Sequence, residues 1–411
     1  MKKRGGYRAN FGQRLGKFSP ETAARLAEKP RIWIHAVSVG EANLAGLVLH
    51  ELRRLAPDES FIISTTSSTG YGVCENLAQD DDVLIYLPVD FPSVVRRSLD
   101  IINAKALVLT ESEFWPNIIR TCRKKDIPVI LINGRISDRS APRYKKLKCF
   151  FGDVFKCFSK MLVQSEIDKE RLIAAGAPEN IIRVMGSVKF DISPPSREAL
   201  EKSRSTLKDA GISPEAPILL GGSTWRGEET ALAKAWLKAR EKSPEIRLVI
   251  VPRHAERGDE VERELSADGF TVKRRSRMKN GTEPSGGDKN AILMVDTTGE
   301  LFPLYSLADI VFVGKTLPPN IGGQNMIEPA SAGKAVITGP HTENFASVMD
   351  IFRKKNAIKE VSDASELSDA IMWLCEDPAT RDSFGIRAGA AVEENRGALA
   401  RSAEVILSQL E

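Results

Sequence analysis

RIWIHAVSVGEANLAGLVLHELRRL, residues 31–55, contains the pattern that decides the fold. Residues 31–37 form a largely apolar run that predicts a buried β-strand, because a strand covered on both faces needs no polar side. Residues 42–55 predict a helix, since apolar side chains recur along one of its faces at Leu44, Leu47, Val48 and Leu52. A buried strand followed directly by an amphipathic helix is the repeating unit of a parallel sheet with helices on its faces.

The same alternation of strand and helix continues through the first half of the chain. Short apolar runs predict strands at residues 61–64, 83–87, 106–109, 129–132, 161–164 and 183–185. Helices are predicted at residues 70–78, 93–102 and 118–125. We therefore predict that residues 31–192 form a doubly wound α/β domain, in which ligands bind beyond the carboxyl ends of the strands.

A second domain is predicted after a polar, proline-containing linker at residues 193–216, which holds one helix. Strands are expected at residues 217–221, 248–252, 291–296, 310–313 and 335–338, and helices at residues 228–242 and 261–269. Residues 274–290 are predicted to be a mobile surface loop. We expect residues 217–411 to form a second Rossmann-like domain that faces the first across a cleft. The pattern leaves open whether the last helix packs back on the first domain.

The composition indicates a globular protein of two or three domains without a metal site. The chain has 411 residues, 42% of them hydrophobic and 28% charged, and no apolar run approaches the roughly 18 residues of a membrane span. Its net charge of +4 is too small to indicate nucleic-acid binding. Five scattered cysteines without a C-x-x-C pair indicate free thiols in a reducing compartment. The four histidines include no pair four residues apart, which argues against a zinc site.

The opening segment, residues 1–30, is much more basic than the rest of the chain. It contains eight Lys and Arg against two acidic residues, with aromatic and apolar residues between the charges. Two interpretations are open. Such a stretch binds an anionic lipid surface, or it is a solvated N-terminal arm.

Three carboxylates stand where the first domain would bind a ligand. Glu41 follows the first predicted strand and opens the first helix, so it is either a helix cap or a general base for an incoming hydroxyl. Glu111 and Glu113 follow the strand at residues 106–109 beside an aromatic residue and a proline, which indicates site residues rather than a solvated loop. The acidic run at residues 80–82 precedes a strand in a polar turn, which favours a solvated loop over a metal site.

The second domain lacks the glycine motifs of dinucleotide enzymes and P-loop NTPases, yet glycines cluster after its strands. Such turns let backbone N–H groups approach a phosphate, which favours a nucleotide in this half. Arg253 follows a buried strand, and Glu328 follows a pair of glycines. An arginine and a glutamate at these places fit a phosphate and a ribose, and they fit a structural salt bridge equally well.

Six ordered motifs resemble those of 3-deoxy-D-manno-octulosonic acid (Kdo) transferases. They are WIHAVSVGE (33–41), TESEFWPN (110–117), GSVKFD (186–191), VPRHAER (251–257), DTTGEL (296–301) and GGQNMIEPA (322–330). The resemblance implies the B-type glycosyltransferase fold and an inverting transfer of Kdo from CMP-Kdo to a lipid A precursor in lipopolysaccharide core biosynthesis. It implies neither metal nor other cofactor. It places the enzyme at an anionic membrane surface, the cytoplasmic face of the inner membrane, with the family's anchor segment absent from this chain.

The resemblance also implies roles for individual residues. Glu41 matches the family's proton acceptor, Glu111 and Lys189 match positions that stabilise the transition state, and Glu113 lies beside them in sequence. The positions that match CMP contacts are Pro252, Arg253, Thr298, Gly299, Glu300, Asn325, Met326, Ile327 and Glu328. The chain departs from the family where Gly314-Lys315-Thr316 replaces a G-G-S-like run and where Gln324 replaces a histidine.

Residues 135–151 are predicted to form a surface for the phosphorylated glycolipid acceptor. Aromatic side chains stand among the basic residues Arg135, Arg139, Arg143, Lys145, Lys146 and Lys148. The alternative is a solvated basic loop that covers the sheet.

For the whole protein, two alternatives to a Kdo transferase stay open. One is a nucleotide-sugar epimerase or hydrolase of the same fold, which would leave the basic segments without a role. The other is a non-catalytic peripheral membrane-binding relative, in which the acidic site residues would be dispensable.

Overall fold

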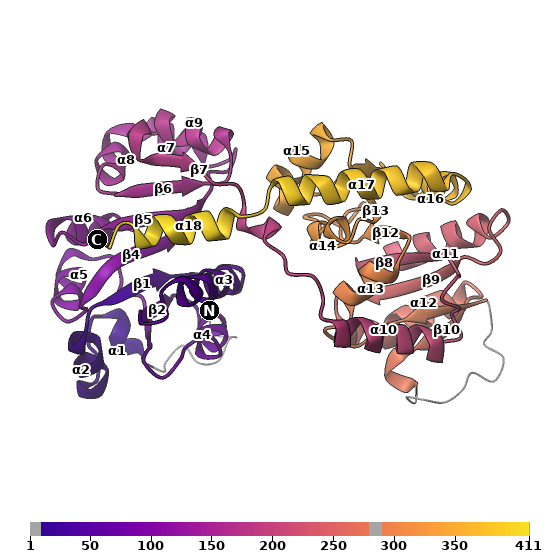
Figure 1. Ribbon diagram of the computed structural model, residues 1–411, viewed down its shortest axis with the longest axis horizontal. Helices are drawn as coiled ribbons and strands as arrows, with labels where there is room; N and C mark the ends of the chain where they lie inside the picture. The colour runs from indigo at the N-terminus through magenta and orange to yellow at the C-terminus, as the bar shows by residue number, and fades with distance from the viewer. Residues whose placement is uncertain (1–9, 279–289, 411) are drawn as a thin grey trace. The chain divides into compact units, whose positions relative to one another are not determined.

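The structure is a computed structural model that describes residues 10–278 and 290–410. The chain divides into two compact units, Met1–Asp191 with Arg396–Glu411, and Ile192–Asn395. Each unit contains a seven-stranded sheet, and every strand pairing in both sheets is parallel (Figure 1). The predicted α/β class with two Rossmann-like sheets is confirmed.

The first unit has its strands in the order β3-β2-β1-β4-β5-β6-β7. They are β1 (Arg31–His35), β2 (Phe61–Thr65), β3 (Val83–Tyr86), β4 (Ala104–Thr110), β5 (Val129–Gly134), β6 (Lys160–Val163) and β7 (Ile182–Val184). The chain fills one side of the sheet from β1 to β3 and then returns to place β4 beside β1. This reversal makes the gap between β1 and β4 the topological switch point, where ligands of such sheets bind.

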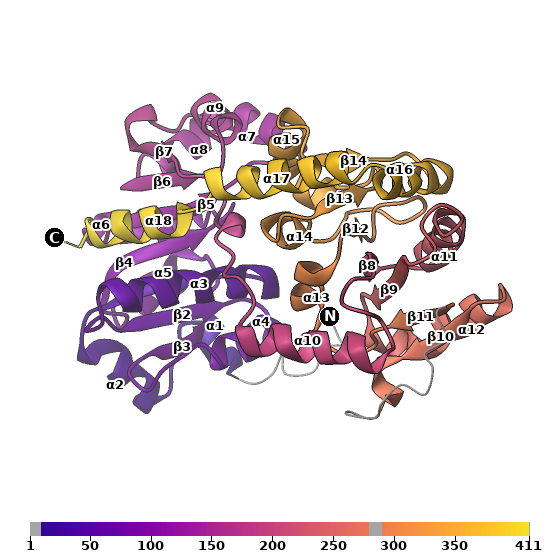
Figure 2. The same cartoon turned by 45° about the vertical axis from the view of Figure 1, so that its right-hand side comes forward.

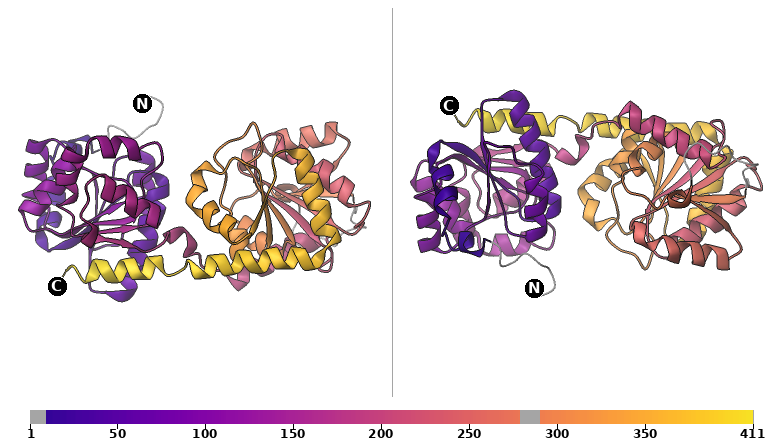
Figure 3. Two further views of the ribbon diagram at one scale, coloured as in Figure 1. Left: turned by 90° about the horizontal axis from the view of Figure 1, so that it is seen from above. Right: turned by 90° about the horizontal axis from the view of Figure 1, so that it is seen from below.

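Helices cover both faces of the first sheet (Figure 3). Alternate strand residues point to opposite faces, so Trp33 packs in one core and Ile32 and Ile34 in the other. One face holds α2 (Pro20–Glu28), α5 (Pro92–Leu99), α6 (Pro116–Lys124), α8 (Lys148–Phe155) and α9 (Glu166–Ala174). The other holds α3 (Val39–Leu55), α4 (Ser68–Glu75) and the C-terminal α18 (Ala398–Leu407). The last helix is therefore part of the first unit's core.

The second unit has the strand order β10-β11-β9-β8-β12-β13-β14, with its switch point between β8 and β12. The strands are β8 (Ile218–Thr224), β9 (Arg247–Pro252), β10 (Thr271–Arg274), β11 (Ala291–Met294), β12 (Ile310–Val313), β13 (Ala335–Thr338) and β14 (Ile358–Glu360). One core lies under α11 (Glu228–Ala239), α12 (Gly258–Ala267) and α16 (Ala364–Glu376). The residues expected to form a linker include α10 (Arg197–Asp209), which belongs to this unit and packs on α13 (Leu301–Leu307; Figure 2).

The remaining helices of the second unit are α14 (Ile327–Ser331), α15 (Ala346–Lys354) and α17 (Pro378–Glu394), of which α14 and α17 pack on β13. None of the helices in the described part of the chain is long and apolar enough to cross a bilayer.

The described part of the predicted basic arm, residues 10–30, is folded onto the edge strand β3. The Gln13 side-chain oxygen accepts a hydrogen bond from Tyr86 N at 2.9 Å, and the Arg14 guanidinium lies 4.1 Å from the Tyr86 ring centroid. The Leu26 side chain is fully buried. A solvated arm, one of the two interpretations left open, is therefore excluded for these residues, which begin with α1 (Phe11–Arg14). Residues 1–9 lie outside the described part of the chain.

Two further predictions of exposed loops are wrong for part of their residues. Asp82 is buried, and its carboxylate accepts from Phe61 N and Gln79 N at 2.9 Å each, so it is structural, whereas Asp80 and Asp81 are exposed as predicted. Residues 274–278, expected within a mobile loop, end β10 and form a short helical turn, and Arg274 Nε donates to Asp296 at 2.8 Å. The rest of that loop, residues 279–289, lies outside the described residues.

Candidate active site

The acidic residues of the first unit meet at the carboxyl ends of β1 and β4. Glu41 lies in the first turn of α3, which follows β1, and Glu111 directly follows β4. Glu111 has a φ of 53°, a left-handed conformation. Its N–H donates to Ile132 O at 3.0 Å and its carbonyl accepts from Arg135 N at 3.3 Å, so strand β5 fixes its backbone. Both carboxylates thus lie at the switch point that the strand order defines.

Glu41 is a helix-capping residue whose carboxylate is held by the loop after β1 and by the last residue of β4. Ser38 is the N-cap of α3, and its hydroxyl accepts from Glu41 N at 3.4 Å. In return, Glu41 Oε1 lies 3.0 Å from Ser38 Oγ, and Oε2 accepts from Val37 N at 3.0 Å and Thr110 Oγ1 at 3.1 Å. A carboxylate oxygen accepts two hydrogen bonds, and among the residues that the structure describes Oε1 has one donor. The cap and the general base are therefore compatible functions of one side chain.

Glu111, Glu113 and Lys189 form a half-buried charged cluster with Glu41. Burial raises the pKa of Glu111, the nearby Lys189 ammonium opposes that rise, and the charge of Glu41 adds to it. Burial lowers the pKa of Lys189, and Glu111 opposes this shift. The pKa of Glu113 is raised to about 7 by burial and then by the charge of Glu41. Ionisable groups whose pKa values are shifted in opposite directions by their surroundings are typical of catalytic sites.

The short helix η2 (Val188–Phe190), which bears Lys189, is anchored by residues that the sequence analysis missed. Asn133, at the end of β5, is buried, and its side-chain oxygen accepts from Val188 N at 3.4 Å. The carboxylate of Asp191 accepts from Gly397 N at 2.5 Å and Leu399 N at 2.6 Å, which joins this segment to α18. Asn133 is a polar residue at the end of an apolar strand and Asp191 a polar residue after a helical turn, and neither pattern reveals a partner 55 or 206 residues away.

In the second unit, the predicted CMP-contacting residues lie at or after the carboxyl ends of three strands, β9, β11 and β12. Arg253 follows β9 and is exposed, and its backbone N–H donates to Thr224 O at 3.1 Å. Asn325 and Glu328 lie at the start of α14, where the Asn325 amide nitrogen donates to Glu328 Oε1 at 3.0 Å and burial raises the pKa of Glu328. Met326 and Ile327 are both 0% exposed, backbone included, so neither residue offers surface to a ligand in this structure.

The motif after β11 divides into exposed and buried parts. Thr298 and Gly299 are exposed, whereas Glu300 is 6% exposed. The Glu300 carboxylate accepts from Thr297 Oγ1 at 2.7 Å and lies 3.4 Å from both Thr206 Oγ1 and Arg275 Nε. It therefore ties α10 to this edge of the sheet, and the loop of Thr298 and Gly299 is the part that a ligand can contact.

The basic segment of the first unit is helical. Residues Ala141–Lys146 form α7 and α8 follows it, so the segment is not a loop there, and its role as an acceptor surface stays a prediction. Leu147 and Phe150 are each 46% exposed among the exposed residues Arg139, Arg143, Lys145, Lys146 and Lys148. Arg135 instead lies beside Glu111, where its charge opposes the rise in the pKa of that carboxyl group.

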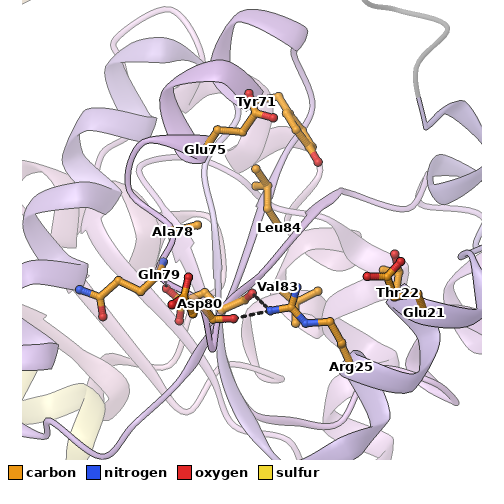
Figure 4. Close-up of a pocket in the computed structure, with 11 residues that line it drawn as sticks. Glu21, Thr22, Arg25, Tyr71, Glu75, Ala78, Gln79, Asp80, Val83 and Leu84 are labelled. Atoms are coloured by element: carbon orange, nitrogen blue, oxygen red, sulfur yellow. Dashed lines mark hydrogen bonds between the residues drawn. The ribbon is translucent and has the colours of Figure 1, made fainter.

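A hollow of the first unit lies beside the edge strand β3 of its sheet, between α2, α4 and β3 (Figure 4). Arg25 crosses it and donates to Asp80 O at 2.6 Å and Asp82 O at 2.7 Å. No residue of the predicted site lines this hollow. Among the residues that the structure describes, no group of three or more His, Cys, Asp or Glu side chains could hold a metal ion.

The two sheets and the residues at their carboxyl edges define a protein of the B-type glycosyltransferase fold. A glycosyltransferase from Rickettsia africae has a TM-score of 0.59 and 16% identity, and the match covers 93% of this chain and 99% of that one. Anabaena HepE in complex with UDP has a TM-score of 0.57 and 13% identity, with 92% and 99% covered. The UDP-GlcNAc 2-epimerase of Neisseria meningitidis has a TM-score of 0.52 and 16% identity, with 92% and 99% covered. At these identities the likeness shows the fold alone.

Sequence relatives narrow this class to one family. Residues 9–192 match the family model of 3-deoxy-D-manno-octulosonic-acid transferase (kdotransferase). The 3-deoxy-D-manno-octulosonic acid transferase of Haemophilus influenzae is 30% identical over 406 residues, which are 98% of this chain and 92% of that protein. The chain belongs to the Kdo transferase family, and the resemblance seen in its motifs is confirmed.

A longer relative shares the same region. A bifunctional glycosyltransferase/methyltransferase of Fusobacterium nucleatum is 36% identical over 349 residues, 84% of this chain. The matched region is 53% of that protein, so this chain corresponds to about half of its length.

Proposed function

We propose that this protein transfers Kdo, with inversion, from CMP-Kdo to the lipid A precursor lipid IVA at the cytoplasmic face of the inner membrane. The observation that supports this most strongly is the Glu41 carboxylate at the switch point of the first sheet. Three donors hold it, and one acceptor position has no donor among the described residues. Family membership supports the sugar that is moved.

In the proposed reaction, Glu41 accepts the proton of the acceptor hydroxyl as its oxygen attacks the anomeric carbon of Kdo. The bond between that carbon and the CMP phosphate oxygen breaks in the same displacement, which inverts the anomeric centre. Glu111 and Lys189 are proposed to stabilise the transition state. Lys189 does so by its positive charge near the departing phosphate, and the Glu111 carboxylate favours the charged form of Lys189.

The CMP is proposed to bind the second unit through Arg253, Asn325 and the loop of Thr298 and Gly299. Kdo carries its own carboxylate, so the donor presents two anions to these groups. The proposal assigns charge stabilisation to side chains and backbone amides and needs neither a metal nor another cofactor.

The surface of α7 and α8 is the proposed contact with lipid. Lys145, Lys146 and Lys148 would attract phosphates of the acceptor and of anionic lipids, at about 1 kcal/mol per basic residue near a membrane surface. Leu147 and Phe150, which are exposed between them, would enter the interface.

The test is to mix the purified chain with CMP-Kdo and tetra-acylated lipid A precursor and to follow the lipid by mass spectrometry. We expect a mass increase by one or more Kdo units, and the increase gives the number of additions. Release of CMP without a change in the mass of the lipid would contradict this acceptor and support hydrolysis of the donor. Hydrolysis is the alternative that the likeness to an epimerase fold keeps open. Absence of both products would support a non-catalytic role.

A further inference from the structure

Glu228, the first residue of α11, joins two loops of the second unit. Its side chain is 1% exposed, and its carboxylate accepts four backbone N–H groups. Oε1 lies 2.9 Å from Thr316 N and 3.0 Å from Leu317 N, and Oε2 lies 2.8 Å from both Trp225 N and Lys315 N. Trp225 follows β8 and the other three follow β12, the two strands that flank the switch point. The buried carboxylate therefore fixes both loops where a ligand is expected to bind.

Lys315 occupies a backbone position that favours glycine. Its φ is 61°, and a non-glycine residue in this left-handed region costs about 1 kcal/mol or more. Its N–H is bound by Glu228, and its carbonyl accepts from Gly323 N at 2.9 Å, so the backbone is fixed from both sides. The family that the chain resembles commonly has a G-G-S-like run here. The lysine side chain therefore distinguishes this chain from the common family pattern.

The Lys315 ammonium is held over an aromatic ring beside the motif that begins at Gly322. Nζ lies 4.6 Å from the Trp225 ring centroid, and that ring contacts His254 edge-on at 5.6 Å. A Cβ added at Gly322 would lie 3.7 Å from Nζ, so the ammonium is next to that backbone. In the described ranges 10–278 and 290–410, no carboxylate forms an ion pair with Lys315. Among the described residues, the ammonium is therefore held over the Trp225 ring without an ion-pair partner.

We propose that Lys315 binds the phosphate of the donor nucleotide, and that Glu228 and Trp225 are its positioning residues. The inference rests on the proposed function, because it takes a nucleotide sugar as the donor. The backbone N–H of Lys315 is bound to Glu228 and cannot serve the phosphate, so the ammonium supplies the donor that this loop otherwise lacks. A lysine ammonium acts here as a point charge, which suits either of the two non-bridging oxygens of the donor phosphate.

The inference is tested by calorimetric titration of the full chain with CMP and with cytidine, which lacks the phosphate. Lys315→Gly removes the ammonium at a position where glycine is the favoured residue, and Lys315→Met removes only the charge. We expect each variant to bind CMP roughly tenfold or more weakly than the wild type, with cytidine affinity unchanged. Higher ionic strength should shrink the difference, because salt screens the ammonium from the phosphate. Lys238→Met, at an exposed site on α11, is the matched control and should change neither affinity.

Three outcomes would overturn the inference, and they have different meanings. Unchanged CMP affinity in both variants would show that Lys315 does not bind the phosphate. An equal loss for CMP and cytidine would show that the substitutions disturb the loop rather than remove a phosphate contact. Failure of the wild-type chain itself to bind CMP would contradict the proposed donor, and the assignment of Lys315 would fail with it.

Discussion

Thr110 Oγ1 lies 3.1 Å from Glu41 Oε2 and 3.1 Å from His35 O, so the last residue of β4 orients the carboxylate that follows β1. The hydroxyl reaches across the switch point from the neighbouring strand and constrains the rotation of the Glu41 carboxylate. Val37 N and Ser38 Oγ supply the other contacts. Catalysis by a general base requires this kind of fixed geometry, because small displacements of a reacting group reduce rates steeply.

Thr110→Val should therefore lower kcat about tenfold while leaving KM for CMP-Kdo unchanged, because valine keeps the shape and removes the hydroxyl. The free energy of unfolding should fall by only about 1 kcal/mol, the usual value of one lost hydrogen bond. Steady-state kinetics and urea unfolding measure the two effects. Thr271→Val, at the start of the edge strand β10, is the control. A change in KM alone would show that Thr110 serves binding rather than orientation of the base.

Glu41→Gln should lower the transfer rate by roughly 10²-fold or more with CMP affinity retained, because the amide cannot accept the hydroxyl proton. A helix cap without catalytic function predicts instead a loss of stability near 1 kcal/mol and full turnover. Single-turnover transfer assays and thermal unfolding distinguish the two. Turnover at the wild-type rate in this variant would contradict the proposed mechanism.

The pKa of Glu113, raised to about 7 in the folded chain, predicts a pH-dependent stability. Between its ordinary value near 4.5 and about 7, the unfolded chain loses this proton while the folded chain keeps it. The unfolded state then binds fewer protons than the folded state. The free energy of unfolding of the wild type therefore falls as pH rises through this range. Glu113→Gln should therefore become more stable than the wild type as pH increases from 4.5 to 7, with no further gain above it.

Urea unfolding at several pH values measures this difference. Glu256→Gln changes a largely exposed carboxylate, with an 80% exposed side chain, and serves as the control. A stability difference that does not vary with pH would show that Glu113 titrates normally in the folded protein.

The sequence predicted the residues whose signal is local and missed those whose partners are distant. Continuous apolar strands identified both sheets, and carboxylates directly after β1 and β4 identified Glu41 and Glu111. The contact between Gln13 and Tyr86 spans 73 residues, so the folding of the basic segment onto β3 has no local pattern. Glu228 also has no local pattern that reveals its role. An acidic residue at the start of a helix is common, and only the bonds to residues 315–317 distinguish this one.

Neutralising the exposed lysines of α7 should separate acceptor binding from donor binding. We expect Lys145→Gln with Lys146→Gln to weaken binding to vesicles that contain lipid A precursor, because two basic residues near a lipid surface contribute about 2 kcal/mol together. CMP affinity should not change. Vesicle sedimentation and calorimetry measure the two affinities, with exposed Lys238 and Lys242 changed to Gln as the matched control. An equal loss of both affinities would contradict the assignment of this surface to lipid.

Glu228→Gln should destabilise the second unit by about 3 kcal/mol, because a glutamine turns an N–H₂ group toward backbone N–H donors and leaves buried amides unpaired. Four N–H groups now share this carboxylate, and a buried glutamine oxygen can accept two of them. Loosening of the loop that bears Lys315 should also weaken CMP binding, by a smaller factor than removal of the ammonium itself. Chemical unfolding and CMP titration of the same samples report both effects. Wild-type stability in this variant would show that the carboxylate does not hold the loops after β8 and β12 together, and CMP binding would then have to be fixed by other contacts.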